Sequence, residues 1–136
     1  MKKYLNPPEL FPSLQYGFSQ VVTSPPGKLI FLSGQTSWDE RQQLRGGDDL
    51  KAQTLHALRN VEIGLRAAGA RLDDIVAMRL YIVDYRAEKS AAIRGALLET
   101  FAGSQPPVST WIGVSALAHE GFLIEIEVTA ILEGAI

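Results

Sequence analysis

The chain contains no cysteine, and this absence excludes disulfide bonds, thiolate metal sites and a cysteine nucleophile. Histidine is scarce as well: His56 and His119 are the two in the chain and lie far apart, which argues against a histidine-based metal site. Long apolar runs are also missing, because no stretch approaches the ~20 residues of a membrane span. The start of the chain lacks the apolar segment of a signal peptide. We therefore expect a soluble cytoplasmic protein without a bound metal.

Basic residues are absent from the C-terminal third of the chain. The last one is Arg94, and the ionisable side chains after it are five glutamates and His119. A surface that binds nucleic acid needs Lys and Arg to neutralise phosphates. The sequence therefore argues against a nucleic-acid partner, and against a ribonuclease.

What the chain does contain is typical of one globular domain, and we predict a single domain over residues 1–136. Of its 136 residues, 46% are hydrophobic and 21% are charged, and no repeat or linker interrupts them. A chain of this length can bury a core without disulfides.

Hydrophobic periodicity predicts five strands and two helices in the order β-β-α-β-α-β-β, an α+β fold with both helices on one face of a sheet. A proline-rich extended arm comes first, and a polar loop over 34–47 separates the second strand from the first helix. Asp48 is the expected N-cap of that helix, and Gly69 its end. The first two strands are expected to form a hairpin around the turn Pro25-Pro26-Gly27, with the second strand covered on both faces. The predicted ranges are 1–13 for the arm, 19–24, 28–33, 75–83, 108–114 and 122–132 for the strands, and 48–68 and 88–101 for the helices.

Alternation within the strands predicts which side chains face the helices. In the last strand the apolar row is Phe122, Ile124, Ile126, Val128 and Ala130, and in the third strand it is Val76, Met78, Leu80 and Ile82. The opposite face then combines apolar and charged side chains: Leu123, Ile131, Val83, Tyr81, Trp111, Arg79, Glu125, Glu127 and Ser109. Two explanations fit this mixture. The face is covered in a closed oligomer whose charged members line a cleft, or it is exposed, with Arg79 paired to a glutamate across strands.

Four short motifs carry a resemblance to a known family. They are Phe18-Ser19-Gln20, Phe31-Leu32-Ser33-Gly34-Gln35, Leu72-Asp73-Asp74-Ile75-Val76 and Ile124-Glu125-Ile126-Glu127-Val128-Thr129-Ala130. With the order of elements, this series resembles the Rid/YjgF family of reactive-intermediate deaminases, also labelled endoribonuclease L-PSP or translation-inhibitor proteins. The resemblance covers roughly residues 16–132.

The resemblance implies a chorismate-mutase-like fold, a homotrimer, and ligand sites in clefts between subunits. It implies hydrolysis of reactive imines and enamines to ketones and ammonia, with neither a metal nor a cofactor. By resemblance Glu125 is the acidic site residue, a carboxylate that can orient water and accept a proton. Gly34 would bring backbone donors close to the ligand. Glu127 is expected to be a bystander, and His119 a solvated loop residue.

One departure from the family pattern bears on the substrate. Most deaminating members carry an Arg on the fourth strand, in a Pro-x-Arg context, that clamps a substrate carboxylate. Here Ser109 stands at that position, Trp111 replaces a small residue, and Phe18 replaces a Tyr. This chain resembles an Arg-less branch of the family.

The missing Arg leaves two alternatives. In the first, Arg79 supplies the cation that binds the substrate carboxylate. In the second, the substrate has no α-carboxylate, and Trp111, Tyr81 and Phe18 shape a more apolar pocket. We favour the second. The expected function is a deaminase of a small reactive imine or enamine that is not specialised for 2-imino acids, with catalytic Glu125 and binding residues Ser109, Trp111, Tyr81, Phe18, Gly34 and Arg79. The alternative is a non-catalytic trimer that binds a small molecule in the same cleft.

Overall fold

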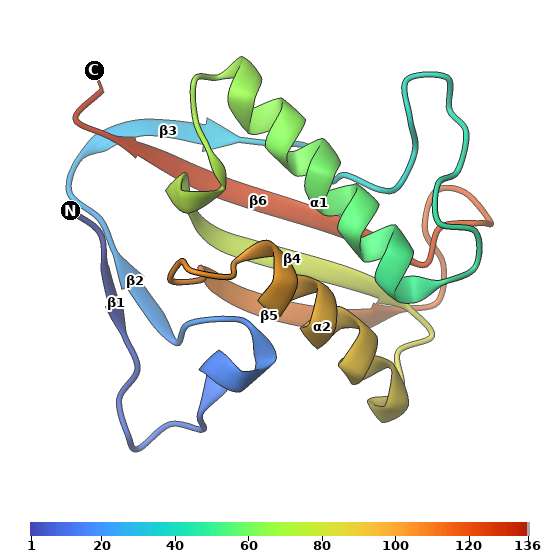
Figure 1. Ribbon diagram of the computed structural model, residues 1–136, viewed down its shortest axis with the longest axis horizontal. Helices are drawn as coiled ribbons and strands as arrows, with labels where there is room; N and C mark the ends of the chain where they lie inside the picture. Colours follow the sequence, from blue (N-terminus) through green and yellow to red (C-terminus); the bar gives the residue numbers. More distant parts are fainter. Residues whose placement is uncertain (136) are drawn as a thin grey trace.

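A computed structural model describes residues 1–135 and places four strands in one mixed sheet (Figure 1). The order across the sheet is β3-β6-β4-β5. The strands are β3 (Gly27–Phe31), β4 (Ile75–Val83), β5 (Val108–Val114) and β6 (Ile124–Glu133). β4 and β5 are parallel and the other pairs are antiparallel. A parallel pair needs a crossover connection, and the second helix provides it.

Both helices, α1 (Leu50–Ala67) and α2 (Ser90–Thr100), lie side by side on one face of the sheet, as predicted (Figure 1). The N-cap of α1 is Asp49, whose side chain accepts a 2.8 Å hydrogen bond from the Ala52 amide, so the prediction of Asp48 was wrong by one residue. The helix ends at Ala67, and Gly69, the glycine expected to terminate it, follows the C-cap residue Ala68 with a left-handed φ of +79°. The second helix begins two residues later than predicted, after a 3-10 turn over Ala87–Lys89.

The apolar row predicted for the last strand is confirmed as the centre of the core. Phe122, Ile124, Ile126, Val128 and Ala130 are all at most 4% exposed, although the strand itself starts at Ile124. The four residues from Ile124 to Ala130 share one core with Leu58, Val61 and Leu65 of α1 and Ile93 and Leu97 of α2. Phe122 packs instead against Trp38, with ring centroids 4.7 Å apart. Burial of each such side chain contributes about 1.5–3 kcal/mol to folding. In β4 a register irregularity between Ile75 and Ala77 buries Ile75 in place of the predicted Val76.

The predicted N-terminal hairpin was wrong. β2 (Val21–Thr23) pairs with β1 (Lys3–Leu5) from the proline-rich arm, and these two strands form a separate sheet. Pro25 and Pro26 have fixed φ angles and no N–H to donate, so they favour a change of direction over a tight hairpin. The next strand, β3, pairs instead with β6.

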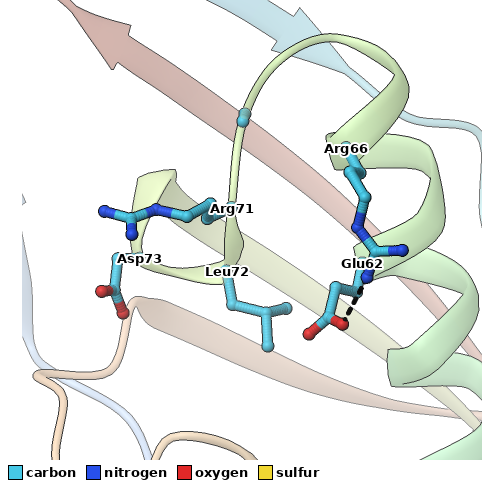
Figure 2. A pocket seen from close by; sticks show the side chains of 6 residues that line it. Glu62, Arg66, Arg71, Leu72 and Asp73 are labelled. Carbon is cyan, nitrogen blue, oxygen red and sulfur yellow. Dashed lines mark hydrogen bonds and ion pairs between the residues drawn. The ribbon is translucent and has the colours of Figure 1, made fainter.

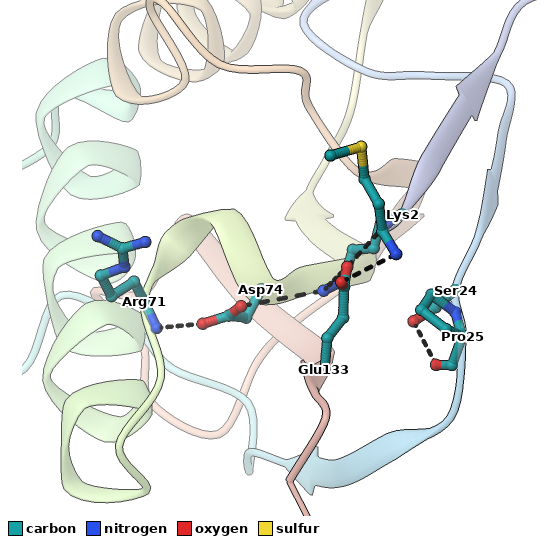
Figure 3. Close-up of polar contacts among 7 residues, drawn as sticks. Lys2, Ser24, Pro25, Arg71, Asp74 and Glu133 are labelled. Carbon is teal, nitrogen blue, oxygen red and sulfur yellow. Dashed lines mark hydrogen bonds and ion pairs between the residues drawn. The ribbon is translucent and has the colours of Figure 1, made fainter.

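Lys2 fastens this N-terminal arm to the end of β6. Its side chain is 6% exposed, and its ammonium lies 3.2 Å from Glu133 and 3.9 Å from Asp74 (Figure 3). The Lys2 amide donates a further 2.8 Å hydrogen bond to the same carboxylate of Glu133. Burying an ammonium is tolerated here because two carboxylates compensate its charge.

The second predicted strand is not covered on both faces. β3 is an edge strand, and its Leu29 and Phe31 are 57% and 73% exposed. They pair with Ile131 and Thr129, which lie on the face of β6 turned away from the helices. We call the face of the sheet turned away from the helices the open face. At its edge, along β3, it carries exposed apolar side chains. Within the described residues, no helix is long and apolar enough to cross a membrane.

Candidate functional site

The open face of the sheet holds four neighbouring polar side chains. In the register of β4 and β6, Tyr81 lies opposite Glu125, and Arg79 lies opposite Glu127. The Arg79 guanidinium is 3.5 Å from the Glu127 carboxylate, and the Tyr81 hydroxyl donates to the same carboxylate at 3.3 Å. Burial, followed by the negative charge of Glu127, raises the pKa of Tyr81 above its ordinary value. Glu127 is thus occupied by two partners.

Glu125 differs from Glu127, since within residues 1–135 its carboxylate makes no ion pair and no side-chain hydrogen bond. It lies against Gly34, where a Cβ would overlap its Oε2 and would stand 2.8 Å from its Cδ. Two backbone hydrogen bonds keep Gly34 close to Glu125. The Gln35 amide donates to the Ile126 carbonyl at 2.8 Å, and the Ile126 amide donates to the Gln35 carbonyl at 2.9 Å. Position 34 therefore admits only glycine without moving the carboxylate.

Two side-chain amides on α1, the buried Gln53 and the half-buried Asn60, hold the loops on either side of Glu125. Asn60 donates to the carbonyls of Thr36 and Trp38, both at 2.8 Å, in the loop that follows Gly34. Gln53 donates to the Gly121 carbonyl at 2.9 Å and accepts from the Leu123 amide at 2.9 Å, at the entry to β6. Gly34 and Glu125 are therefore positioned from the same helix.

An aromatic pocket of about 290 Å³ lies on the other side of the sheet, where β5 meets the start of α2. Its lining is Phe11, Tyr16, Phe18, Tyr85, Ser90, Ser109 and Trp111, without a charged side chain. The ring of Trp111 is 6.1 Å from that of Phe18 and 6.5 Å from that of Tyr85. Within residues 1–135 the buried Ser109 Oγ and Trp111 Nε1, from two of its lining residues, make no hydrogen bond. Buried polar atoms are normally paired, so these two atoms have unused hydrogen-bonding capacity.

The location of Ser109 and Trp111 corrects the predicted face assignment. In the parallel register they lie beside Met78 and Leu80, both core residues, and so face the helices. The open face of β5 instead carries Thr110 and Ile112. Alternation could not decide between the two sets, because β5 is an edge strand with apolar residues on both sides.

The structure therefore divides the predicted site into two groups. Glu125, Gly34, Tyr81 and Arg79 gather at the open face, whereas Ser109, Trp111 and Phe18 meet in the aromatic pocket. Phe18 reaches this pocket because the Ser19 amide donates a 3.0 Å hydrogen bond to the Pro107 carbonyl. Within one chain the two groups do not form a single site.

Several lining residues escaped the sequence analysis. Phe11, Tyr16, Tyr85 and Ser90 complete the aromatic pocket, and the Arg94 guanidinium lies 5.2 Å from the centroid of the Tyr16 ring. Three aromatic residues between positions 11 and 18 were a visible signal for this pocket. His56 is half-buried on α1, and His119 is exposed, as expected of a solvated loop residue, with its ring 5.2 Å from that of Trp38.

A further pocket, of about 320 Å³, lies at the end of α1 and contains none of the predicted site residues (Figure 2). Its charged side chains are Glu62, Arg66, Arg71 and Asp73, and the first two form a 2.9 Å ion pair. Its formal charges cancel.

Comparison with known proteins gives consistent matches. The family model described as Endoribonuclease L-PSP matches residues 11–132. A Yersinia pestis structure described as YyfB, of unknown function in the conserved Rid protein family, is 39% identical with a TM-score of 0.92, over 96% of this chain and 98% of that one. A RutC family protein of Saccharolobus solfataricus is 30% identical over 76% of this chain and 79% of its own length. The structure of RidA from a Psychrobacter species is 27% identical with a TM-score of 0.68, over 85% of this chain and 88% of that one.

Proposed function

Because this chain belongs to the Rid/YjgF family, described also as endoribonuclease L-PSP, we propose that it hydrolyses a small reactive imine or enamine to a carbonyl compound and ammonia. Its chorismate-mutase-like fold, two helices on one face of a mixed sheet, is the fold of the family. The observation that carries the proposal is the Glu125 carboxylate, which has no side-chain partner among the described residues and lies against Gly34 at the open face.

The proposed reaction needs one base and one water molecule. The carbon of a C=N bond is already electrophilic, so a water held by Glu125 adds to it while the carboxylate accepts one water proton. Glu125 passes this proton to the imine nitrogen, which gives a neutral carbinolamine. The carboxylate then accepts the hydroxyl proton of the carbinolamine as the C=O bond forms, and it delivers that proton to the nitrogen as the C–N bond breaks and ammonia leaves. Glu127 is already engaged by Arg79 and Tyr81 and therefore fits the role of bystander.

We propose that the complete site forms between subunits of a homotrimer. Glu125 is on the open face and Ser109 is on the helix side of β5, so a substrate can contact both only if two chains contribute. The exposed Leu29 and Phe31, on the same open face as Glu125, support a covered face, because such side chains are costly to leave in water. A neighbouring chain would bring its aromatic pocket to this face.

The proposed substrate carries no α-carboxylate. Ser109 replaces the family's anion-binding Arg, and no charged side chain lines the aromatic pocket. Arg79, the predicted substitute, is on the opposite face and is paired with Glu127. The unpartnered Trp111 indole N–H and Ser109 hydroxyl suit a neutral acceptor on the substrate, such as a carbonyl oxygen or an imine nitrogen.

Ammonia release from a panel of imines generated in solution tests the proposal. Glu125→Gln keeps the shape and removes the base, and is expected to lower kcat by about 100-fold or more. Glu127→Gln, on the same strand and face, is the matched control and should retain most activity. Equal rates for the two variants would contradict the role of Glu125. Ligand binding without turnover by the wild type would favour the alternative, a non-catalytic trimer.

A further inference from the structure

A second pocket with an excess of positive charge lies between the loop over 34–47 and the outer side of α1. It has a volume of about 260 Å³ and shares no residue with the aromatic pocket or with the group around Glu125. Its lining is Ser37, Trp38, Asp39, Arg45, His56, Arg59, Asn60 and Ile63. Asn60 and Trp38 also belong to the hydrogen bonds that hold the loop after Gly34, but Arg59, His56 and Ser37, on which the inference below rests, have no role in the proposed reaction.

Two guanidinium groups and one carboxylate set the charge of this pocket. Arg45 is compensated, because its Nη2 lies 2.8 Å from the Asp39 carboxylate. Arg59 has no carboxylate partner within the described residues, and its Nη1 instead lies 3.3 Å from the Nδ1 of His56. That contact is a hydrogen bond only when the imidazole is neutral and accepts it. One positive charge is therefore left over, in contrast to the pocket of Figure 2, where the charges cancel.

His56 is held neutral by these surroundings. Burial lowers its pKa first, and the positive charges of Arg59 and Arg45 lower it further. Asp39, the one carboxylate in the pocket, is engaged by Arg45 and by the backbone amides of Arg41 and Gln43. An anion placed between His56 and Arg59 would reverse the effect, because it favours the protonated imidazole.

A buried hydroxyl in the same pocket lacks a partner. Ser37 is 1% exposed, and within residues 1–135 its Oγ makes no hydrogen bond. A buried hydroxyl without a partner is costly, and an acceptor supplied by a ligand would remove that cost. Next to it, the Trp38 ring and Ile63, which is 59% exposed, form an apolar wall.

From this combination we infer that the pocket binds an oxyanion, a carboxylate or phosphate group, carried on a flat apolar body. The oxyanion accepts hydrogen bonds from the Arg59 guanidinium and the Ser37 hydroxyl, and the apolar body lies along Trp38 and Ile63. Arg59 is the residue that distinguishes a charged ligand from a neutral one.

The test follows the ring signals of His56 by NMR over pH 5–8.5, at constant ionic strength, with the full-length protein. The probes are inorganic phosphate, benzoate and, as the uncharged analogue of benzoate, benzamide; chloride is the reference. We expect phosphate and benzoate to raise the pKa of His56 and benzamide to leave it unchanged. His119 does not line the pocket, and its ring reaches it only through Trp38, 5.2 Å away, so its signals should respond less than those of His56.

Two variants on the same helix complete the experiment. Arg59→Gln is expected to weaken benzoate binding about tenfold or more, the loss typical of one charged hydrogen bond. Arg66→Gln removes an exposed arginine that is paired with Glu62 outside the pocket, and should bind benzoate as the wild type does. Equal binding of benzoate and benzamide, unchanged binding by Arg59→Gln, or equal shifts of both histidines would each overturn the inference.

Discussion

Introducing the missing arginine at position 109 is the most direct way to examine the substrate of this protein. Ser109→Arg places a guanidinium in a pocket that has five aromatic side chains and no charge of its own. If the lost clamp decides the substrate, the wild type should handle 2-imino acids poorly, and the variant should gain on them but not on imines without a carboxylate.

The size of the gain follows from the interaction restored and from the space around it. A charged hydrogen bond of the Arg–carboxylate kind contributes about 1.5–3 kcal/mol, which corresponds to about 10- to 150-fold in kcat/KM. Trp111 packs against Phe18 and Tyr85 and crowds the new side chain, so the gain in kcat/KM of the single variant should be near the lower value, about tenfold. Ser109→Arg combined with Trp111→Cys should approach the upper value. Ser109→Lys restores the positive charge without the two parallel hydrogen bonds that an Arg can donate to a carboxylate, so its gain in kcat/KM should be smaller.

The assay is ammonia release from 2-iminopropionate and from its methyl ester, measured for each protein under identical conditions. The ester controls for general damage, because its rate should not rise in any variant. The reasoning would be refuted if the wild type already turned over 2-iminopropionate faster than the ester and neither Arg variant improved on it. Another cation would then hold the carboxylate, and Arg94, whose guanidinium lies over the Tyr16 ring, is the one to replace.

Three further predictions concern the site, the assembly and the stability of the fold. Gly34→Ala should lower activity by about 10- to 100-fold, because the new Cβ displaces the Glu125 carboxylate; an unchanged kcat/KM would separate Gly34 from the site. Light scattering should give about three times 14.9 kDa for the wild type and a smaller mass for Phe31→Asp, which places a charge on the open face; a monomeric wild type would contradict the trimer. Partial burial raises the pKa of Glu133, but hydrogen bonds from the N-terminal amine and Lys2 outweigh it and lower the pKa overall. The carboxylate therefore stabilises the fold at neutral pH and loses this contribution as the pH falls below about 4.5. In urea titrations Glu133→Gln should be less stable than the wild type at pH 7, and the difference should shrink as the pH falls below about 4.5; a difference that stayed constant in acid would assign the effect to packing.

Strong periodicity made much of the fold predictable. The alternating row from Phe122 to Ala130 and the strand over 75–83 appear in the structure as predicted, because each buries one continuous apolar face. Gly69 ends the first helix for a local reason, its left-handed backbone. The ends of the helices were less predictable. Asp48 and Asp49 are both good N-cap residues for α1, and the choice between them depends on how the preceding loop packs against the helix.

The candidate site was predictable residue by residue but not in its arrangement. Short motifs identified Glu125 and Gly34, and departures from the family pattern identified Ser109 and Trp111. The roles of all four residues remain predictions. Their division between two sides of the sheet could not be foreseen. It depends on the register of β5 against β4, and an edge strand with apolar residues on both sides does not specify its register by pattern.

The sequence by itself determined the family, the two helices over a sheet, the buried row and the absence of cysteine chemistry, since all of these depend on residue type and local spacing. Only the tertiary structure decided which strands pair, which glutamate is left without a partner, and which aromatic side chains enclose a pocket. Glu125 and Glu127 are two residues apart with the same chemistry, and only Glu127 meets Arg79 and Tyr81. Such differences arise from contacts between segments distant in the chain, whose geometry no local pattern encodes.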